Sequence, residues 1–244
     1  MGTPVKPYAK SEATKKEQVA EMFNNIAHSY DFLNHFFSLG IDIRWRKKAL
    51  AILKKESPKT ILDVATGTGD FALQTVSSHL NPESVIGVDI SEGMLEQGRI
   101  KIAKKNLSHI IQLRYGDSEN LPFGDNSFDA FTVAFGVRNF ENLSKGLTEM
   151  LRTLKPGGMG VILEFSKPAK FPMKQLFGFY FKRIMPTVGK MVSKDSSAYT
   201  YLPQSVAAFP EGEDFLTIMR QCGYKNCYRK ELTGGVATIY IGKK

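Results

Sequence analysis

The stretch that most constrains the fold is a glycine-containing turn in residues 60–70, Thr-Ile-Leu-Asp-Val-Ala-Thr-Gly-Thr-Gly-Asp. Residues 60–64 have the apolar character of a short buried strand, and from Asp70 the apolar spacing becomes helical. Gly67 and Gly69 therefore lie between a strand and a helix N-terminus, where glycine permits a tight turn and a close approach of the backbone to a ligand. This arrangement predicts a nucleotide-like ligand at the carboxyl edge of a parallel sheet.

Two kinds of ligand fit this turn. Gly67-x-Gly69-x-x-Ala72 matches the dinucleotide pattern, with Asp89 downstream as a ribose acceptor. Asp63 lies within the strand itself, and the dinucleotide pattern does not require it. An S-adenosylmethionine site can use Asp63, because the amino-acid end of that ligand carries a cation. We therefore favour S-adenosylmethionine, and an NAD-dependent oxidoreductase is the alternative from another class.

The composition limits the compartment and the partners. A chain of 244 residues, 42% hydrophobic, is long enough for one α/β domain. Cys222 and Cys227 lack metal-ligand spacing, so we expect no metal and a reducing compartment. We find no signal-peptide pattern and no apolar run of about 18 residues, which predicts a cytoplasmic protein. The net charge of +9 comes without a nucleic-acid-binding signature, so we expect no nucleic acid as a partner.

Strand and helix patterns alternate along the chain. After the first strand, further strands are predicted at residues 84–89, 110–115, 130–135 and 159–165. A helical stripe runs from Leu143 to Leu154, and residues 155–158, Lys-Pro-Gly-Gly, end it. Two more strands, 224–232 and 237–241, are joined by Thr-Gly-Gly as in a hairpin. We predict an α/β fold with a doubly wound, mostly parallel sheet, helices on both faces and an antiparallel C-terminal hairpin.

The first 50 residues differ from the rest of the chain. We expect a disordered arm over residues 1–10 and a helix from Ser11. The aromatic segment 28–40 forms either a helix pair packed on the domain or a lid over the ligand. Residues 44–48 should open a further helix with a solvated basic face, with Trp45 turned inward together with Leu50. We therefore separate residues 1–50, an arm and a helical lid or substrate segment, from the main domain, 51–244.

Polar residues also follow the second and third predicted strands. Asp89 ends the second strand, where ribose hydroxyls are usually held. Asp117 and Ser118 follow the third strand, where a carboxylate can accept a hydrogen bond from an adenine amino group. Both positions lie at the predicted ligand-binding edge.

Together these motifs resemble those of class I S-adenosylmethionine methyltransferases: Asp63-x-Ala-x-Gly67-x-Gly69, Val88-Asp89, Asp117-Ser118, and residues 121–123, 127–129 and 154–158. Narrower motifs resemble the ubiquinone/menaquinone biosynthesis C-methyltransferases: Phe135-Gly-Val-Arg-Asn139, Leu163-Glu-Phe-Ser-Lys-Pro168 and Tyr201-Leu-Pro-Gln-Ser205. The resemblance covers nearly the whole chain, and 51–244 is then the methyltransferase domain.

The resemblance implies that S-adenosylmethionine is the methyl donor. It places the glycine turn and the strand-end polar residues on that cofactor: Asp63, Gly67, Thr68, Gly69, Asp89, Asp117 and Ser118. The sequence departs from the family at Ala134, where many relatives have a Ser that contacts the cofactor, and at Asp42, where some have a His.

The resemblance also implies the reaction, which is methylation of a ring carbon of a prenylated quinol, ortho to a hydroxyl. We favour demethylmenaquinol as the substrate, with the benzoquinol of the ubiquinone pathway as the alternative. The predicted catalytic residues are Arg138, Asn139 and Tyr30. Arg138, a poor base with a pKa above about 12, should stabilise the developing oxyanion, and Tyr30 should orient or relay. Alternatively, Arg138 only pairs with a carboxylate such as Asp31.

Residues 167–200 are expected to form an insertion in the methyltransferase domain. Its apolar residues fall on one helical face: Met173, Leu176, Phe177, Tyr180, Phe181 and Ile184. Its basic residues lie elsewhere on the helix or flank it: Lys167, Lys170, Lys174, Lys182, Arg183, Lys190 and Lys194. One interpretation of this pattern is contact with an anionic membrane surface, which would make the protein peripheral at the inner face of the membrane. A packing helix or a homodimer contact is the alternative.

Overall fold

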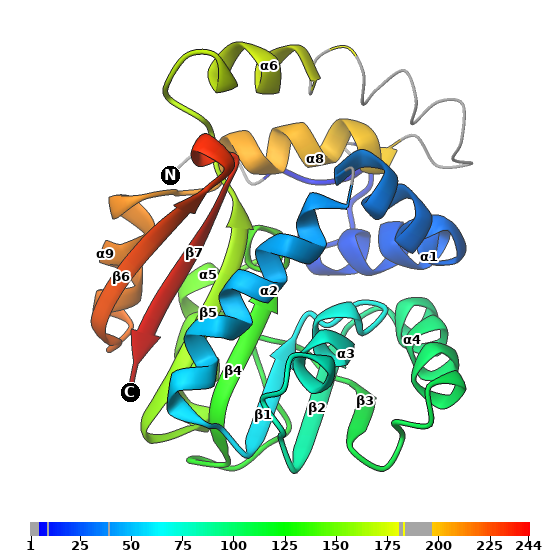
Figure 1. Ribbon diagram of the computed structural model, residues 1–244. Coiled ribbons are helices and arrows are strands. Elements are labelled where there is room, and N and C mark those ends of the chain that lie inside the picture. Colours follow the sequence, from blue (N-terminus) through cyan, green and yellow to red (C-terminus); the bar gives the residue numbers. More distant parts are fainter. Residues whose placement is uncertain (1–4, 9, 39, 181–182, 184–196) are drawn as a thin grey trace.

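The computed structural model describes residues 5–8, 10–38, 40–180, 183 and 197–244, with the backbone alone at 32–37 and 199. Its centre is a seven-stranded sheet in the order β3-β2-β1-β4-β5-β7-β6 (Figure 1). The strands are β1 Thr60–Val64, β2 Ser84–Asp89, β3 Ile111–Tyr115, β4 Phe128–Ala134, β5 Leu154–Phe165, β6 Lys225–Leu232 and β7 Ala237–Lys243. β1 to β5 pair in parallel, and β7 is antiparallel to both β5 and β6. The predicted doubly wound sheet and its antiparallel hairpin are confirmed.

Helices cover both faces of this sheet (Figure 1). They are α1 Lys15–Ser38, α2 Ile41–Leu53, α3 Asp70–Ser77, α4 Glu92–Lys104, α5 Leu143–Thr153, α6 Met173–Phe179, α8 Ser197–Ala208 and α9 Glu213–Gln221. Short 3-10 turns are η1 Lys54–Glu56, η2 Val137–Asn139 and η4 Thr233–Gly235. Apolar residues of α2, α3 and α4 pack on one face of the sheet, and those of α5 and α9 pack on the other.

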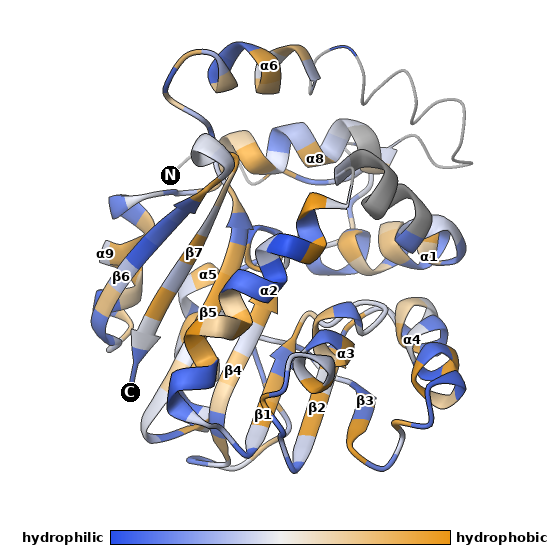
Figure 2. Ribbon diagram, in the orientation of Figure 1, coloured by the Kyte–Doolittle hydropathy of each residue, from blue (hydrophilic) through white to orange (hydrophobic). Residues whose placement is uncertain are grey.

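Successive side chains of β1 point to opposite faces of the sheet. Ile61 packs with the α2 and α3 side, whereas Leu62 and Val64 pack with the α5 and α9 side. Because alternate residues of a strand share a face, Asp63 lies on the same face as Ile61. In the register of the sheet, Asp63 stands beside Thr132 of β4. β4 and β5 in the middle of the sheet are apolar along most of their length, whereas the edge strand β6 is largely hydrophilic (Figure 2).

The largest difference from the predicted boundaries lies between α5 and β5. The α5 helix ends at Thr153, and the Lys-Pro-Gly-Gly segment belongs to β5 instead of a loop. Gly157 has φ 79°, a left-handed conformation that lets the chain bend within the strand. At this point the pairing of β5 with β4 shifts register between Phe128 and Ala130.

The N-terminal segment is more ordered than expected. Val5 and Tyr8 pack on the α1 cluster, and the Tyr8 amide donates to Gln18 Oε1 at 2.9 Å. The predicted disordered arm is therefore wrong for residues 5–8, while residues 1–4 and 9 lie outside the described residues. Residues 28–38 continue α1 as one helix in place of a helix pair.

The predicted basic face of α2 is only partly solvated. Trp45 and Leu50 are buried as expected, and Arg44 is exposed. Arg46, however, is buried, so this part of the prediction is wrong. The reason is tertiary: the buried carboxylate of Asp42, one turn earlier on α2, pairs with Arg46.

The predicted amphipathic helix is described only in part. Met173–Phe179 forms α6, and no residue of α6 is buried. Phe181, Ile184 and the basic residues Lys182, Lys190 and Lys194 lie outside the described residues. None of the helices that the structure describes has the length and apolar character needed to cross a membrane.

Candidate active site

The glycine turn has the backbone conformation that its sequence predicts. Gly67 and Gly69 have φ 55° and 77°, and α3 begins directly after the turn. The Gly67 amide donates to Asp89 Oδ2 at 2.8 Å, which joins the ends of β1 and β2. A Cβ built on Gly67 meets no atom within 4 Å, so this residue faces open space. The glycine turn therefore borders open space in which a ligand could approach its backbone.

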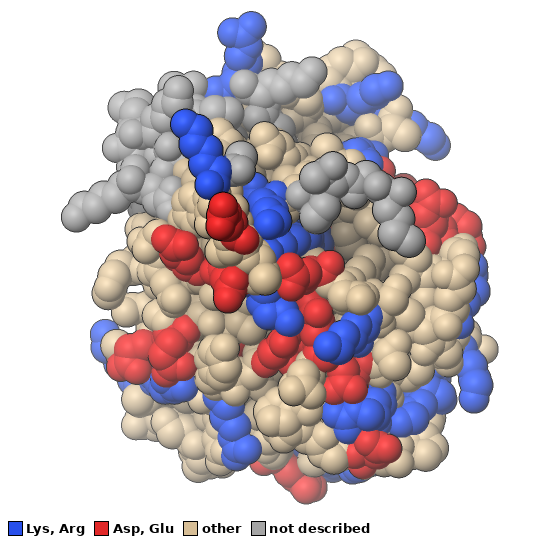
Figure 3. Space-filling model, turned by 180° about the vertical axis from the view of Figure 1, so that it is seen from behind, with Lys and Arg blue, Asp and Glu red and all other residues tan. Residues whose placement is uncertain are grey.

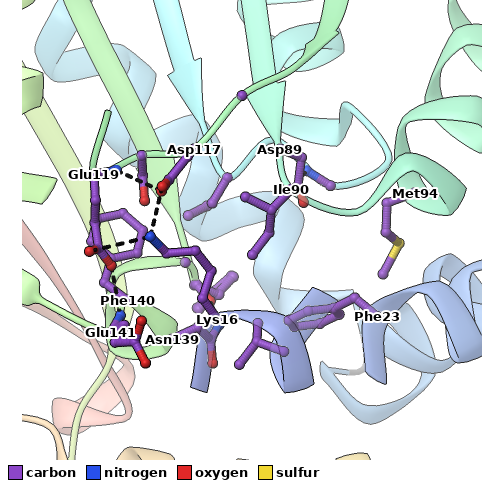
Figure 4. Close-up of a pocket in the computed structure, with 18 of the residues that line it drawn as sticks. Lys16, Phe23, Asp89, Ile90, Met94, Asp117, Glu119, Asn139, Phe140 and Glu141 are labelled. Carbon is purple, nitrogen blue, oxygen red and sulfur yellow. Dashed lines mark hydrogen bonds and ion pairs between the residues drawn. The ribbon is translucent and has the colours of Figure 1, made fainter. Parts of the chain in front are cut away.

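A cavity of about 660 Å³ lies at the carboxyl ends of β1 to β4 (Figure 4). Its walls come from the glycine turn, the loops after β2, β3 and β4, and one side of α1, with these lining residues among them: Lys16, Val19, Phe23, Tyr30, Gly67, Asp89, Ile90, Met94, Asp117, Ser118, Phe135, Asn139 and Phe140. Most of the predicted cofactor residues therefore line one cavity.

Two of the carboxylates that line this cavity, Asp89 and Asp117, are held by different partners. Asp89 Oδ1 accepts from the Ser91 amide at 2.9 Å, and burial raises the pKa of the Asp89 carboxyl. Asp117 Oδ1 accepts from the Glu119 amide at 2.9 Å, and Asp117 Oδ2 pairs with Lys16 Nζ at 2.7 Å (Figure 4). Lys16 comes from α1, so the helix reaches across the cavity to the third strand.

Asp63 and Thr68 line a second, smaller cavity of about 340 Å³ on the other side of the turn. Asp63 is 1% exposed and accepts from the Thr66 hydroxyl at 2.6 Å and the Thr132 hydroxyl at 2.7 Å. Burial raises the pKa of the Asp63 carboxyl to about 6 in spite of these hydrogen bonds. The Thr68 hydroxyl donates to Asp31 of α1 at 2.5 Å.

The predicted catalytic residues lie around the η2 turn. Arg138 Nη1 pairs with Glu164 Oε1 of β5 at 2.9 Å, with the two side chains 8% and 0% exposed. Asp31, the expected partner, bonds Thr68 and Lys101 instead. Arg138 has a carboxylate partner, as the alternative prediction held, but that prediction named the wrong carboxylate.

Asn139 and Tyr30 both line the larger cavity, whereas the Arg138 side chain is not part of its wall. Asn139 Nδ2 donates to the Phe135 carbonyl at 3.3 Å, and its Oδ1 is buried without a hydrogen-bond partner among the described residues. Burial raises the pKa of the Tyr30 hydroxyl to about 12, so the phenol is neutral at physiological pH.

A model of the ubiE/COQ5 methyltransferase family matches residues 11–244. The chain is 52% identical to a demethylmenaquinone methyltransferase of Bacteroides fragilis, over 98% of this chain and 97% of that protein. It is 44% identical to a ubiquinone/menaquinone biosynthesis C-methyltransferase, UbiE, of Geobacter sulfurreducens, over 94% of this chain and 90% of that protein. The chain belongs to the ubiE/COQ5 methyltransferase family.

Solved structures agree with the fold of this family. A possible histamine N-methyltransferase from Thermotoga maritima has TM-score 0.64 and 21% identity, over 92% of this chain and 98% of that chain. The cyclase SpnF has TM-score 0.68 and 16% identity, over 95% of this chain and 97% of that chain. At these identities the likeness establishes the fold alone. Family membership makes the chain an S-adenosylmethionine-dependent C-methyltransferase, and the NAD-dependent alternative is set aside.

Three site features were missed by sequence analysis. The Lys15 ammonium is buried and donates to the carbonyls of Arg138 at 3.0 Å and Phe140 at 2.8 Å. Burial lowers its pKa to about 8. Glu164 was quoted only as part of a motif, and Arg46 was assigned to solvent. A Lys or Arg near a helix start is usually solvated, so nothing in the sequence alone indicated that these two are buried.

In the part of the chain that the structure describes, no group of three or more His, Cys, Asp or Glu side chains is placed to hold a metal ion. The larger cavity instead combines an apolar wall, with Val19, Phe23 and Met94, and carboxylates at its opposite end. Asn139, whose Oδ1 has no hydrogen-bond partner among the described residues, lines the same cavity. A purine nucleoside with an attached amino acid fits this combination of apolar and acceptor groups.

Asp63 should leave a signature in the pH dependence of stability. The pKa of its carboxyl is about 6 in the folded state, above the ordinary value of 3.8, so folding favours the protonated form. Asp63 therefore contributes to the unfolding free energy near pH 4, and this contribution is lost as the pH rises through 6. Only the wild type loses this contribution, because Asp63→Asn has no carboxyl group to titrate. The unfolding free energy of the variant minus that of wild type should therefore increase by about 2–3 kcal/mol from about pH 4 to 6. Urea unfolding measures this difference, and a flat difference would contradict the raised pKa.

Proposed function

We propose that this chain methylates demethylmenaquinol to menaquinol, with S-adenosylmethionine as the methyl donor. The observation that carries the proposal is the 52% identity to a demethylmenaquinone methyltransferase over nearly the full length of both chains. A second relative with that name, from Porphyromonas gingivalis, is 46% identical over 98% of both chains. The aromatic and aliphatic wall of the larger cavity is compatible with a planar, apolar ring.

The proposed cofactor-binding residues are distributed over the two cavities and the glycine turn between them. Asp89 binds the ribose hydroxyls, and Asp117 with Ser118 binds the adenine edge. The glycine turn, Gly67 and Gly69 with Thr68 between them, lies beside the sulfur end, and Asp63 provides negative charge near the ligand's ammonium group. Lys16 now pairs with Asp117, so an adenine amino group would compete with this ion pair.

The N-terminal 50 residues serve as the lid in this proposal. Lys15 bonds the loop after β4, and Lys16 bonds the loop after β3. Farther along α1, Asn24 Oδ1 accepts from the Ser91 hydroxyl at 2.8 Å and from the Gly93 amide at 2.9 Å. The helix is thus fastened to three loops of the 51–244 domain, and the ligand has to enter beneath it or displace part of it.

The methyl acceptor is a quinol carbon next to a hydroxyl, and transfer of the hydroxyl proton to a water makes that carbon nucleophilic. The carbon forms its bond to the methyl group as the sulfur–methyl bond breaks, S-adenosylhomocysteine leaves, and water then takes the proton from the same carbon, which restores the aromatic ring. Arg138 stabilises the oxyanion formed by loss of the hydroxyl proton through its permanent positive charge. Asn139 and Tyr30 orient the quinol from the cavity wall. Arg138 Nε and Asn139 Oδ1 are both buried without a hydrogen-bond partner among the described residues, so each has a hydrogen bond available for a ligand or a bridging water.

The substrate is tested by incubating purified enzyme with labelled S-adenosylmethionine and two short-tailed quinols, a demethylnaphthoquinol and the benzoquinol precursor of ubiquinone. We expect label in the naphthoquinol product, with kcat/KM at least about tenfold higher than for the benzoquinol, a difference of about 1.4 kcal/mol in transition-state binding. Equal rates would assign the chain to both pathways, and no label in either product would overturn the proposal.

The roles of Arg138 and Glu164 separate in a matched pair of variants. Arg138→Gln and Glu164→Gln both break one buried ion pair, so each should lower the unfolding free energy by about 3–5 kcal/mol. Only Arg138→Gln removes the cation. Its kcat should fall by about 10²-fold or more, whereas Glu164→Gln should stay within about tenfold of wild type. Calorimetry with S-adenosylhomocysteine should give similar Kd values for both. Equal losses of kcat would make the pair purely structural.

We also propose that α6 contacts an anionic membrane surface, where a prenylated quinol resides. Phe171, Leu176 and Phe179 are 81%, 57% and 61% exposed. Residues 165–194 contain seven Lys or Arg and no Asp or Glu. At the end of the molecule that holds α6, the charged side chains of the described residues that are visible are Lys or Arg (Figure 3). Apolar groups beside basic ones are the features of an interfacial helix.

Vesicle sedimentation tests this contact. Lys170→Gln with Lys174→Gln should weaken binding to vesicles of anionic phospholipid by about 30-fold, since each charge adds about 1 kcal/mol. Raising the salt concentration should have the same effect, because exposed charges are screened within about 10 Å at 0.1 M. The control pair Lys104→Gln with Lys105→Gln, at the end of α4, should bind as wild type does. Wild-type protein that ignores these vesicles at low salt would favour a packing helix or a homodimer contact.

A further inference from the structure

The smaller cavity differs in chemistry from the larger one. Its walls are mainly polar, with these residues among them: Tyr30, Arg46, Asp63, Thr66, Thr68 and Asp70. It shares Tyr30, Ala65, Gly67 and Ala134 with the larger cavity, so the two adjoin at the glycine turn. A ligand that fills the larger cavity and continues past Gly67 would place its far end among these polar groups.

Arg46 is the cation in this second cavity. It belongs to α2, is 5% exposed, and pairs with Asp42, which is 1% exposed. The guanidinium carbon lies 5.8 Å from the centre of the Phe135 ring, at the boundary of the larger cavity. Arg46 Nε is buried and has no hydrogen-bond partner among the described residues. A buried N–H group of a charged side chain without an acceptor is costly, unless a ligand or water supplies one.

The carboxylates of the cavity balance this cation. Asp63 enters from β1 and is held by the Thr66 and Thr132 hydroxyls. Asp70, from the first turn of α3, already pairs with Lys101 at 2.7 Å. The cavity therefore has an N–H donor with positive charge from α2 and negative charge from β1. An α-amino acid carries the complementary pair, a carboxylate and an ammonium on one carbon.

We propose that Arg46 binds the α-carboxylate of the methyl donor's amino-acid end, while the donor's ammonium lies toward Asp63. This inference rests on the proposed function only for the identity of the methyl donor, and it holds for any methyl acceptor. It makes Arg46 a specificity residue, because α2 then distinguishes the intact cofactor from nucleosides that lack a carboxylate. Gly67 provides the passage, since it lines both cavities and has no side chain to block it.

Calorimetry with three ligands that have a neutral thioether in place of the sulfonium tests this assignment. The first ligand is S-adenosylhomocysteine. The second is its decarboxylated analogue, 5′-(3-aminopropylthio)-5′-deoxyadenosine, which keeps the ammonium and lacks the carboxylate. The third is 5′-methylthioadenosine, which lacks both groups. Arg46→Gln should weaken S-adenosylhomocysteine by about 10- to 100-fold and leave the other two ligands within about threefold of wild type.

Two further variants keep the test decisive. Arg46→Gln leaves Asp42 buried without its cation, so the double variant Arg46→Gln with Asp42→Asn removes both charges together. The same loss of selectivity for the carboxylate is expected in both backgrounds. Arg44→Gln, on the exposed side of the same helix, should bind all three ligands as wild type does.

Two results would overturn the assignment. If Arg46→Gln and the double variant weaken all three ligands equally, Arg46 supports the cavity without contacting the carboxylate. If neither variant changes the affinity for S-adenosylhomocysteine, the carboxylate lies elsewhere. These binding results are independent of the quinol assay, so failure of the proposed substrate would leave them intact.

Discussion

The hydrogen bond from the Gly67 amide to Asp89 is the interaction on which the rest of the site depends. It fixes a left-handed turn at the end of β1 against the end of β2, so the turn cannot relax into the cavity. Asp63 accepts hydrogen bonds from the Thr66 hydroxyl of the turn and the Thr132 hydroxyl of β4, so β4 is linked to the same turn. The buried Asp63 and the half-buried Asp89 thus position backbone and side chains from β1, β2 and β4 before any ligand arrives, and such preorganisation lowers the cost of binding.

Burial beneath α1 and α2 gives the charges of the site their strength. Lys15 is held by two backbone carbonyls, Arg46 by Asp42, and Arg138 by Glu164. Each cation is removed from solvent, so its interactions are weakly screened and its position is restricted. The cost of removing these cations from water is offset by the partners that α2, β5 and the loop after β4 provide.

The sequence predicted the strands, because alternating apolar segments and turn residues are local signals that packing rarely overrides. It also located the glycine turn and the strand-end carboxylates, since parallel strands bring their carboxyl ends to one edge. It did not predict the burial of Arg46 or Lys15, because helical periodicity alone does not tell which of several adjacent basic residues meets a buried acceptor. The sequence also did not predict that Glu164 is the partner of Arg138. This pair joins the loop after β4 to β5, so it depends on which strands are neighbours in the sheet.

Some parts of the site are common to many proteins with this fold, and others determine which reaction takes place. The positions of the charged groups distinguish the two. A doubly wound sheet with a glycine turn supports many reactions, so the turn alone does not select methyl transfer to carbon. Under the proposed function, the groups that distinguish this chain are those on the loop after β4 and on α1 and α2, elements whose residues line the two cavities. Among them, Arg138 is fixed by Glu164 and by the Phe135 carbonyl, yet its Nε has no partner among the described residues. A cation held this firmly does not have to reorganise when negative charge develops beside it, and this is the condition under which a fixed charge accelerates a reaction.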